Sequence, residues 1–229
     1  MKIEAVSENT ILLTFGDTIS EAITPRIVAM EKLIEHHLAP YLVDLVPSYT
    51  TLLMIYDLDR ADYRLMLSLL RKLADTLDDH VQEHDDGRTF DIPVWYDPSV
   101  GYDLENLAKE KNISVGEVIH IHSSKTYRVF AVGFNPGFAF LGKVDARIAT
   151  PRHHSPRSSV AQGSVGIADA QTAIYPLTSP GGWQIIGRSP TQFFDPKGDP
   201  HTASLLQVGD EVRFKPIQKD EFLALGGQL

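Results

Sequence analysis

The stretch GFNPGFAFLGKV, residues 133–144, decides between two folds for the C-terminal part of the chain. Gly137, Gly142 and Lys143 have the spacing of a phosphate-binding loop, G-x-x-x-x-G-K. Such a loop also needs small residues between its glycines, a Ser or Thr after the lysine for Mg²⁺, and a helix that follows. Val144 follows here, two phenylalanines lie between the glycines, and the next residues, VDARIATPR, do not begin a helix. The stretch therefore does not meet the requirements of a phosphate-binding loop, and we interpret its match to that motif as a coincidence.

The residues around this stretch also favour a β-structure. FDIPVWYD is strand-like, residues 103–111 and 114–122 are predicted as two short helices, and Gly and Pro recur from Tyr127 onward. The short β-prone segments between these turns are YRVFAVGF, SVGIA, TAIYPL, WQIIGR and DEVRFKP. This spacing is typical of a closed or sandwich-like β-structure rather than a parallel α/β sheet.

The first part of the chain reads as two copies of a ββα pattern. Residues 2–6 and 10–15 are predicted strands, and 41–46 and 50–56 form a second predicted hairpin around residues 47–49. A helix with one apolar face follows each hairpin, which predicts two helices packed on a four-stranded sheet. The apolar positions are Ile23, Ile27, Met30, Ile34 and Leu38 in the first helix, and Tyr63, Met66, Leu70, Leu73 and Leu77 in the second.

The starts of these helices are marked by capping residues. Thr18 followed by Glu21 offers a capping box, but Pro25 is comfortable only in a first turn, which favours a start near Thr24. Asp59 is the predicted cap of the second helix.

Residues 78–89, DDHVQEHDDGRT, are acidic and polar and predict a domain boundary. We therefore expect an N-terminal domain of residues 1–86 and a β-barrel domain of residues 87–229. The mixture of Asp and His could suggest metal ligands, but a solvated linker is favoured because no regular element would hold these side chains together.

The composition excludes several classes of protein. The 229 residues carry a formal net charge of -9, which argues against nucleic acid as a partner. The absence of cysteine excludes disulfides, thiolate metal sites and a cysteine nucleophile. We see no apolar run of the ~20 residues that a membrane span needs and no signal peptide. These features predict a cytoplasmic location and no membrane partner.

A positively charged cluster stands out in this acidic chain: Arg147, Arg152, His153, His154 and Arg157, with two prolines that restrict the loop. The planar fork of arginine suits carboxylate or phosphate, so the cluster predicts an anion site. A solvated basic loop is the alternative.

Nucleophilic and metal chemistry find little support. Ser164 lies in QGSVG, which lacks the glycine two residues upstream that a nucleophile elbow requires. His120 and His122 lie at a predicted helix end, where a zinc pair is not expected, although His122 could face a pocket. Further polar candidates are Gln171, Thr172, Tyr175 and Trp183, each of which could equally be a satisfied buried residue.

The longest motifs are GFNPGFAFLG, ATPRHHSPR and GSVGIADAQTAIYPLTSPGGWQIIGRSP. Together they resemble the B subunit of prokaryotic 5-oxoprolinase. This family also contains Kip-type inhibitors of sporulation histidine kinases, and its members are often labelled allophanate hydrolase subunit 1. The resemblance implies an α+β fold, with a small ββαββα domain before a cyclophilin-like β-barrel. It also implies an ATP-dependent opening of 5-oxo-L-proline to L-glutamate, performed only with homologues of the A and C subunits of 5-oxoprolinase as partners.

The implied chemistry needs cations near a phosphoryl group and a substrate carboxylate, because phosphorylation of the lactam oxygen would provide a better leaving group. ATP with Mg²⁺ would be a co-substrate of the complex, and no tightly bound cofactor or metal is expected in this chain. The expected catalytic residues are Arg152, Arg157 and Arg188. The expected substrate-binding residues are His122, Phe134, Pro136, Gly137, Phe138, Gln171, Thr172, Tyr175 and Trp183.

The chain departs from the family pattern at two places. Lys143 stands where relatives usually have glycine, and residues 169–173, DAQTA, replace a glycine-rich GGQTG. Because of the second departure, the resemblance does not imply that the backbone N–H groups of residues 169–173 approach a ligand as closely as they do in relatives.

A different class of function stays open at this point. A non-catalytic protein that docks on a sensor histidine kinase would use the same aromatic and arginine residues as interface anchors. A prolyl isomerase rests on fold analogy alone.

Overall fold

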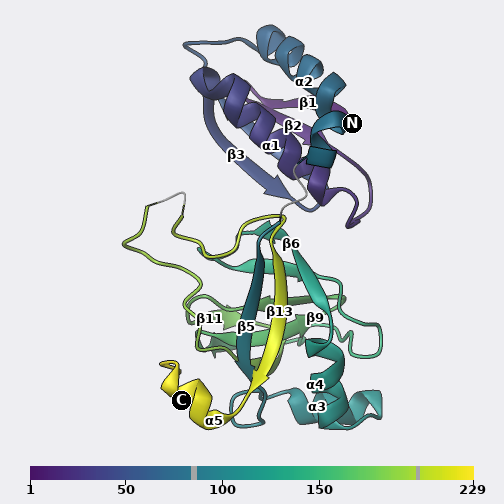
Figure 1. Ribbon diagram of the computed structural model, residues 1–229, viewed down its shortest axis with the longest axis vertical. Coiled ribbons are helices and arrows are strands. Elements are labelled where there is room, and N and C mark those ends of the chain that lie inside the picture. The colour runs from purple at the N-terminus through teal and green to yellow at the C-terminus, as the bar shows by residue number, and fades with distance from the viewer. Residues whose placement is uncertain (84–86, 200–201) are drawn as a thin grey trace. The chain divides into compact units, whose positions relative to one another are not determined.

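The computed structural model describes residues 1–83, 87–199 and 202–229. The chain divides into two compact units, Met1–Gly87 and Arg88–Leu229, and each has its own hydrophobic core (Figure 1). The two units are described separately below.

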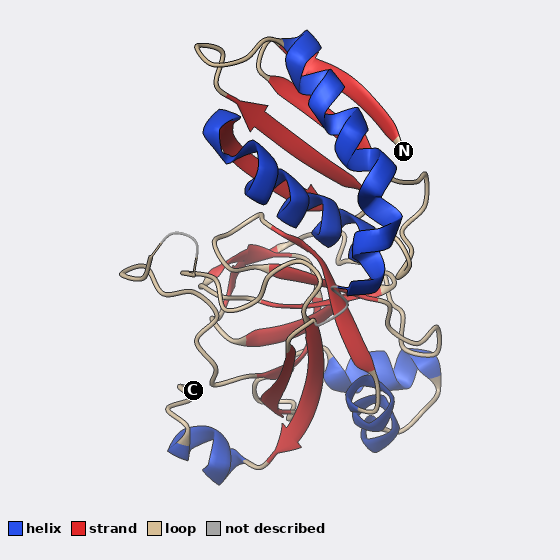
Figure 2. Ribbon diagram, turned by 45° about the horizontal axis from the view of Figure 1, so that its top comes forward, coloured by secondary structure: helices blue, strands red, loops and turns tan. Residues whose placement is uncertain are grey.

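The N-terminal unit is an antiparallel sheet with both of its long helices on one face (Figure 2). The spatial order of its strands is β1-β2-β4-β3. The elements are β1 (Lys2–Ser7), β2 (Thr10–Thr14), α1 (Thr24–Leu38), a 3₁₀ turn η1 (Ala39–Tyr41), β3 (Leu42–Ser48), β4 (Thr51–Tyr56) and α2 (Tyr63–Glu83).

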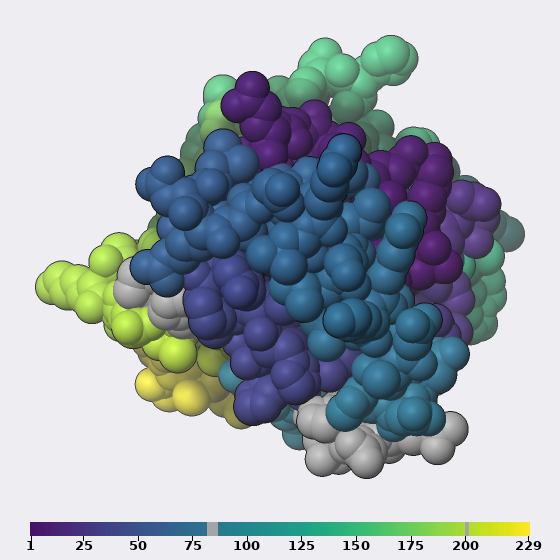
Figure 3. Space-filling model, turned by 90° about the horizontal axis from the view of Figure 1, so that it is seen from above, coloured from purple at the N-terminus to yellow at the C-terminus, as the bar shows by residue number. Residues whose placement is uncertain are grey.

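The core of this unit follows from two periodicities. Side chains of β2 and β4 alternate between buried and partly exposed, so each strand presents one apolar face to the helices. Ile27, Met30 and Ile34 of α1 and Met66 and Leu70 of α2 are fully buried against that face. Figure 3 shows the outer surface of the helical layer, which the opposite faces of the helices form.

The helix ends differ in part from the prediction. Helix α1 begins at Thr24 with Pro25 in its first turn, and no side chain caps it, so the predicted capping box of Thr18 and Glu21 is wrong. Helix α2 is capped by Asp62 rather than by the predicted Asp59. The Oδ1 atom of Asp62 accepts a hydrogen bond from the Leu65 N–H at 2.8 Å.

The predicted linker is also partly wrong, because residues 78–83 belong to α2. Val81 continues the apolar stripe of the helix and packs on the core, and Asp78 forms an ion pair with Arg26 of α1. These two contacts extend the helix into a segment whose composition alone predicts a linker. Residues 84–86 of that segment lie outside the described residues.

The C-terminal unit is a closed barrel of seven described strands in the order β6-β13-β5-β12-β9-β10-β7, with β7 paired back to β6. The closed alternative of the prediction is therefore confirmed. The only parallel pair among these is β13 with β5. The barrel strands are β5 (Thr89–Trp95), β6 (Thr126–Val132), β7 (Ala139–Gly142), β9 (Ser164–Ala168), β10 (Gln171–Ile174), β12 (Gln184–Arg188) and β13 (Glu211–Ile217).

The remaining elements of the C-terminal unit lie outside the seven barrel strands. Helices α3 (Leu104–Lys111) and α4 (Val115–Ser123), both predicted, lie together at one end of it, and α5 (Lys219–Ala224) follows β13 (Figure 1). Strands β8 (Arg157–Val160) and β11 (Ser179–Gly181) form a separate two-stranded ribbon.

Alternation along the strands separates two apolar clusters. Leu141 of β7 and Ile174 of β10 face the barrel core, whereas Phe140 and Ala173 belong to a second cluster. This second cluster also contains Val160 of the β8–β11 ribbon, so we infer that it lies on the outer side of the barrel wall.

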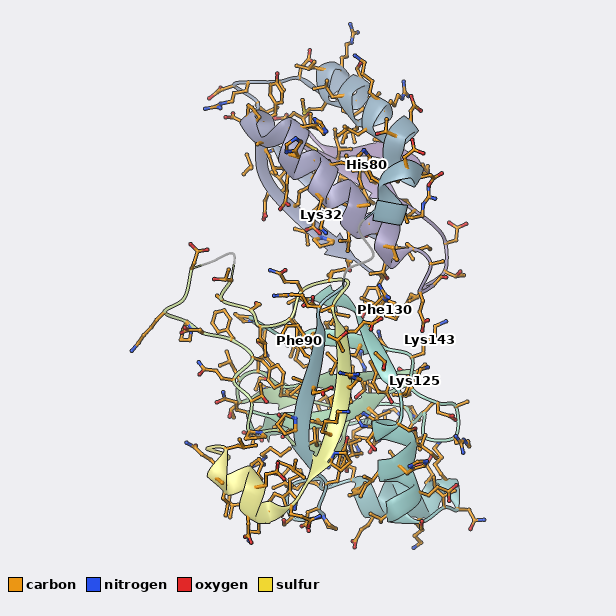
Figure 4. All side chains as sticks on the ribbon, in the orientation of Figure 1. Lys32, His80, Phe90, Lys125, Phe130 and Lys143 are labelled. Atoms are coloured by element: carbon orange, nitrogen blue, oxygen red, sulfur yellow. The ribbon has the colours of Figure 1, made fainter. Side chains whose placement is uncertain are left out.

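The stretch that resembled a phosphate-binding loop is part of this wall. Residues 139–142 form β7, which pairs with β6 and β10. The backbone polar groups there are therefore used in the hydrogen bonds of the sheet rather than to bind phosphate. Lys143 is exposed, and its carbonyl accepts a hydrogen bond from Lys125 Nζ at 2.7 Å (Figure 4). No helix follows Lys143 directly. The rejection of the phosphate-binding loop therefore agrees with the structure.

Candidate anion-binding cavity on the barrel wall

A cavity of about 480 Å³ opens over the outer apolar cluster of the barrel. The residues that line it come from the turn after β6, from β7, from the loop before β8, and from the segment around β11. They are Phe134, Asn135, Phe138, Phe140, Arg152, Pro156, Tyr175, Ser179, Pro180, Gly181, Gly182 and Trp183.

Aromatic rings form much of this lining. The ring of Phe138 lies edge-on to those of Tyr175 and Trp183, with centroids 5.2 and 5.8 Å apart. Phe140 packs beside both Phe138 and Trp183. Such a surface binds flat or apolar parts of a ligand through burial and ring contacts.

The turn at residues 133–138 holds one aromatic residue at the rim. Gly137 has a φ of +78°, and an added Cβ would lie 2.8 Å from the Phe193 carbonyl oxygen, so the turn requires glycine there. Phe134 also has a positive φ, of 71°, which is strained for a bulky residue. Phe134 is 68% exposed, and its ring centroid lies 5.4 Å from the ring centroid of Phe138. Pro136 is exposed in the same turn and does not line the cavity.

Arg152 is the cation of this cavity. Its guanidinium lies over the ring of Trp183, 5.6 Å from the ring centroid, in a cation–π arrangement. It forms no ion pair with any carboxylate of the described residues. Arg152 is exposed, and it presents a positive charge without an ion-pair partner among the described residues beside an aromatic surface.

The loop that carries Arg152 is fixed by Asp103, whose side chain is buried. Asp103 accepts hydrogen bonds from Arg157 Nη2 at 2.6 Å and from the Ile185 N–H at 2.7 Å, and it contacts His153 Nε2 at 3.1 Å. His153 directly follows Arg152, and Arg157 begins β8, so one carboxylate ties both ends of this short segment to β12. This is a positioning role that sequence reasoning did not assign.

Neutral polar groups complete the cavity. Gly181 lies against the Tyr175 hydroxyl so closely that an added Cβ would be 2.0 Å from it. Burial raises the pKa of Tyr175, and a backbone hydrogen bond with Trp183 and the charges of Arg152 and Arg157 oppose this. The hydroxyl is therefore protonated at neutral pH and serves as a neutral polar group.

Two further cavity residues carry buried polar atoms without a partner in the described structure. They are Nδ2 of Asn135 and Oγ of Ser179. Buried polar atoms usually have a hydrogen-bond partner, so these two are available to a ligand or to water. Sequence reasoning missed both, because single Asn and Ser residues in turns carry no distinguishing pattern.

The three arginines expected to act together are placed apart. Of the three, only Arg152 lines the cavity, whereas Arg157 forms an ion pair with Asp103. Arg188 lines a different cavity and donates to the Gln228 carbonyl and the Tyr102 hydroxyl. Arg147, from the same charged cluster, is exposed and paired with Asp145.

His122 and Thr172 lie inside the barrel rather than at the cavity. Both are fully buried, and His122 Nε2 lies 2.9 Å from Thr172 Oγ1 and its Nδ1 lies 2.8 Å from the Tyr96 hydroxyl. Burial lowers the pKa of His122 from 6.5 to about 3, so the ring is neutral at physiological pH. Gln171, at the start of β10, is not among the cavity-lining residues either.

This buried histidine predicts an acid-sensitive barrel. Below pH 6.5 the unfolded chain protonates His122 while the folded barrel does not until about pH 3, so stability falls as pH falls through this window. The loss is roughly 1 kcal/mol per pH unit from this residue. Urea unfolding followed by tryptophan fluorescence from pH 6.5 to 4.5 should show a shallower pH dependence for His122→Gln than for the wild type. His154→Gln, which changes an exposed histidine, is the matched control, and equal slopes for His122→Gln and wild type would contradict the assignment.

Metal centres and membrane-spanning helices are absent from the described residues. No group of three or more His, Asp or Glu side chains there could hold a metal ion. No helix in the described parts of the chain is both long enough and apolar enough to cross a membrane.

Comparison with known proteins adds independent information. Residues 1–205 match the family described as carboxyltransferase domain, subdomain C and D. The chain is 37% identical over 231 residues to the B subunit of 5-oxoprolinase from Bacillus subtilis (strain 168), an alignment that covers 97% of this chain and 95% of that protein.

Solved structures agree with this relation. The conserved uncharacterised protein PH0987 from Pyrococcus horikoshii is 44% identical, with a TM-score of 0.57 over 96% of this chain and 100% of that one. TTHA0988 is 36% identical with a TM-score of 0.80 over 93% of this chain, and the match covers 40% of that longer chain. The near full-length match to a 5-oxoprolinase B subunit, together with the family match, shows that the chain belongs to the family of 5-oxoprolinase B subunits.

Proposed function

We propose that this protein is the B subunit of an ATP-dependent 5-oxoprolinase, which hydrolyses 5-oxo-L-proline to L-glutamate together with homologues of the A and C subunits. The observation that carries the proposal is the alignment over nearly the whole chain with a 5-oxoprolinase B subunit. We further propose that the N-terminal ββαββα unit and a cyclophilin-like barrel are the architecture of this subunit, in the cytoplasm.

In this proposal the cavity beside Arg152 receives the substrate. 5-Oxoproline has a flat lactam ring and one carboxylate, and the cavity offers an aromatic surface and one unpaired cation. Arg152 would bind the carboxylate, and Trp183 and Phe138 would pack on the ring. Asn135 and Ser179, whose buried polar atoms have no partner in the described structure, would bind the lactam amide.

The residues of the cavity fit the lactam better than they fit a nucleotide. Among the described residues that line the cavity, Arg152 is the only cation, and none has an acidic side chain that could bind Mg²⁺. ATP, as co-substrate of the complex, would supply a phosphoryl group to the lactam oxygen. The contribution of this chain would be to bind and orient the lactam and to keep water away from it.

An incomplete site of this kind needs partner subunits. The cavity holds a cation and aromatic rings, but none of the described residues that line it has a carboxylate or imidazole that could act as a general base. The exposed and strained Phe134 at the rim is a suitable anchor for another subunit. A stable complex would bury ~800 Å² or more on this side.

The proposal is tested by the ATPase activity of the purified three-subunit complex. The complex should release ADP only when 5-oxoproline is present, because phosphorylation needs the lactam as acceptor. Proline is the matched control, since it has the same ring and carboxylate but no lactam carbonyl. ADP release that is the same with 5-oxoproline, with proline and without either would contradict the proposed function.

The exposed Lys143 provides a prediction about the rejected phosphate-binding loop. Lys143→Ala should leave the ATP-dependent turnover of the complex within a few-fold of wild type, because this side chain follows a barrel strand and does not line the cavity. Steady-state kinetics with varied ATP would measure it. A loss on the order of a thousand-fold, the effect of removing a key stabiliser of transition-state charge, would restore the phosphate-binding interpretation.

A further inference from the structure

A second cavity, of about 380 Å³, surrounds Arg188 at the end of β12. Arg188 is only 6% exposed, which is unusual for an arginine that has no acidic partner among the described residues. One wall of this cavity is formed by the segment after α5, including Gln228. It shares no lining residue with the cavity beside Arg152.

The hydrogen bonds of Arg188 leave its charge uncompensated. Nη1 donates to the Gln228 carbonyl at 3.1 Å and Nη2 to the Tyr102 hydroxyl at 3.0 Å, and both of these partners are neutral. Nε is buried and has no partner among the described residues. Ser164, the cross-strand neighbour of Arg188, also has a buried Oγ without a partner there.

The other polar side chains of the cavity are neutral and suited to donate. Thr178 Oγ1 accepts the Gln162 N–H and Ser189 Oγ accepts the Thr191 N–H, both at 3.2 Å. A hydroxyl oxygen that accepts a hydrogen bond can still donate its own hydrogen, so both groups can donate to a ligand. A buried cation whose partners are all neutral is costly unless an anion balances its charge.

We propose that this cavity binds a small free monocarboxylate through Arg188. One guanidinium and several neutral donors balance a single negative charge, whereas a phosphate dianion would bring an excess charge into a buried site. The two oxygens of a carboxylate also match the paired N–H donors of a guanidinium group.

The site is separate from the proposed lactam cavity, and neither proposal depends on the other. Tyr102 contacts both Arg188 and Arg157. Its hydroxyl accepts a hydrogen bond from Arg188, and the Arg157 guanidinium lies 5.7 Å from its ring centroid. A carboxylate bound at Arg188 would therefore be distinguishable from one bound at Arg152.

The Nε–H group of Arg188 offers a direct test by nuclear magnetic resonance. In a proton–nitrogen spectrum of arginine side chains, the Arg188 Nε–H signal is assigned by its loss in Arg188→Lys. Titration of the wild-type chain with acetate should shift this signal saturably, and acetamide, a neutral molecule of nearly the same shape, should not. Phosphate should bind at least ten-fold more weakly than acetate.

Two variants make the test specific. Arg152→Lys should leave the acetate titration of the Arg188 signal unchanged, whereas Thr178→Val, at an exposed lining residue, should weaken it several-fold. If Arg188→Lys does not fold, the signal can be assigned by backbone-linked experiments on the wild type. The proposal is overturned if acetate causes no saturable shift, if acetamide acts like acetate, or if phosphate binds as tightly.

Discussion

Replacement of Asp103 by alanine should lower the free energy of unfolding of the C-terminal unit by about 2–4 kcal/mol. The Asp103 side chain is 4% exposed and accepts from the Arg157 guanidinium and from the Ile185 N–H. Its removal leaves a partly buried cation and a buried N–H group without their acceptor. Urea unfolding followed by tryptophan fluorescence measures this unit alone, because both tryptophans, Trp95 and Trp183, lie in it.

Two further variants separate the causes. Asp103→Asn keeps an acceptor for the Ile185 N–H but loses the charge, so it should fall between wild type and Asp103→Ala. Asp91→Ala removes a half-exposed carboxylate of β5 that pairs with Arg213, and it should cost under about 1 kcal/mol. If Asp103→Ala cost no more than Asp91→Ala, Asp103 would not be the anchor of the loop that carries Arg152.

Replacement of Arg152 by alanine should reduce the turnover efficiency of the reconstituted complex roughly 30-fold or more. This corresponds to ~2–5 kcal/mol for truncating one partner of a charged contact that the bound substrate and the partner subunits would bury, at 1.36 kcal/mol for each factor of ten. Arg152 has no ion-pair partner in the described structure and lies over Trp183, where a substrate carboxylate would be its partner. Initial rates at varied 5-oxoproline concentration would measure kcat/KM.

The matched control for this experiment is Arg147→Ala. Arg147 comes from the same charged stretch and is exposed like Arg152, but it pairs with Asp145 and does not line the cavity. It should retain near wild-type kinetics. Arg152→Lys should have an intermediate effect, since it keeps the charge but loses the planar group over Trp183. Equal kinetics for Arg152→Ala and Arg147→Ala would show that Arg152 is a solvated surface residue and does not bind the substrate.

Much of the fold could be predicted from local patterns, because alternation and apolar stripes reflect burial directly. The stripe of α1, the two short helices α3 and α4, and the strand of WQIIGR are examples. The end of α2 could not be predicted in this way. It depends on the packing of Val81 and on the ion pair between Asp78 and Arg26, which are 52 residues apart.

The candidate site was less predictable, because it depends on which face of the barrel wall a strand residue occupies. Thr172 and Ala173 are adjacent in sequence, yet Thr172 contacts His122 inside the barrel and Ala173 lies in the outer cluster. A motif that contains both residues cannot tell these faces apart until the register of β10 is known. For the same reason the sequence could not reveal that Asp103, 54 residues before Arg157, is its partner.

The most direct test of the proposed function is the release of L-glutamate from 5-oxoproline and ATP. We predict no release by this chain alone, no release by the A and C subunits without it, and turnover when all three are mixed. Robust turnover by the isolated chain would contradict the dependence on partners. An inactive three-subunit mixture, combined with loss of autophosphorylation when the protein is added to a sensor histidine kinase, would contradict the enzyme proposal and favour an inhibitor.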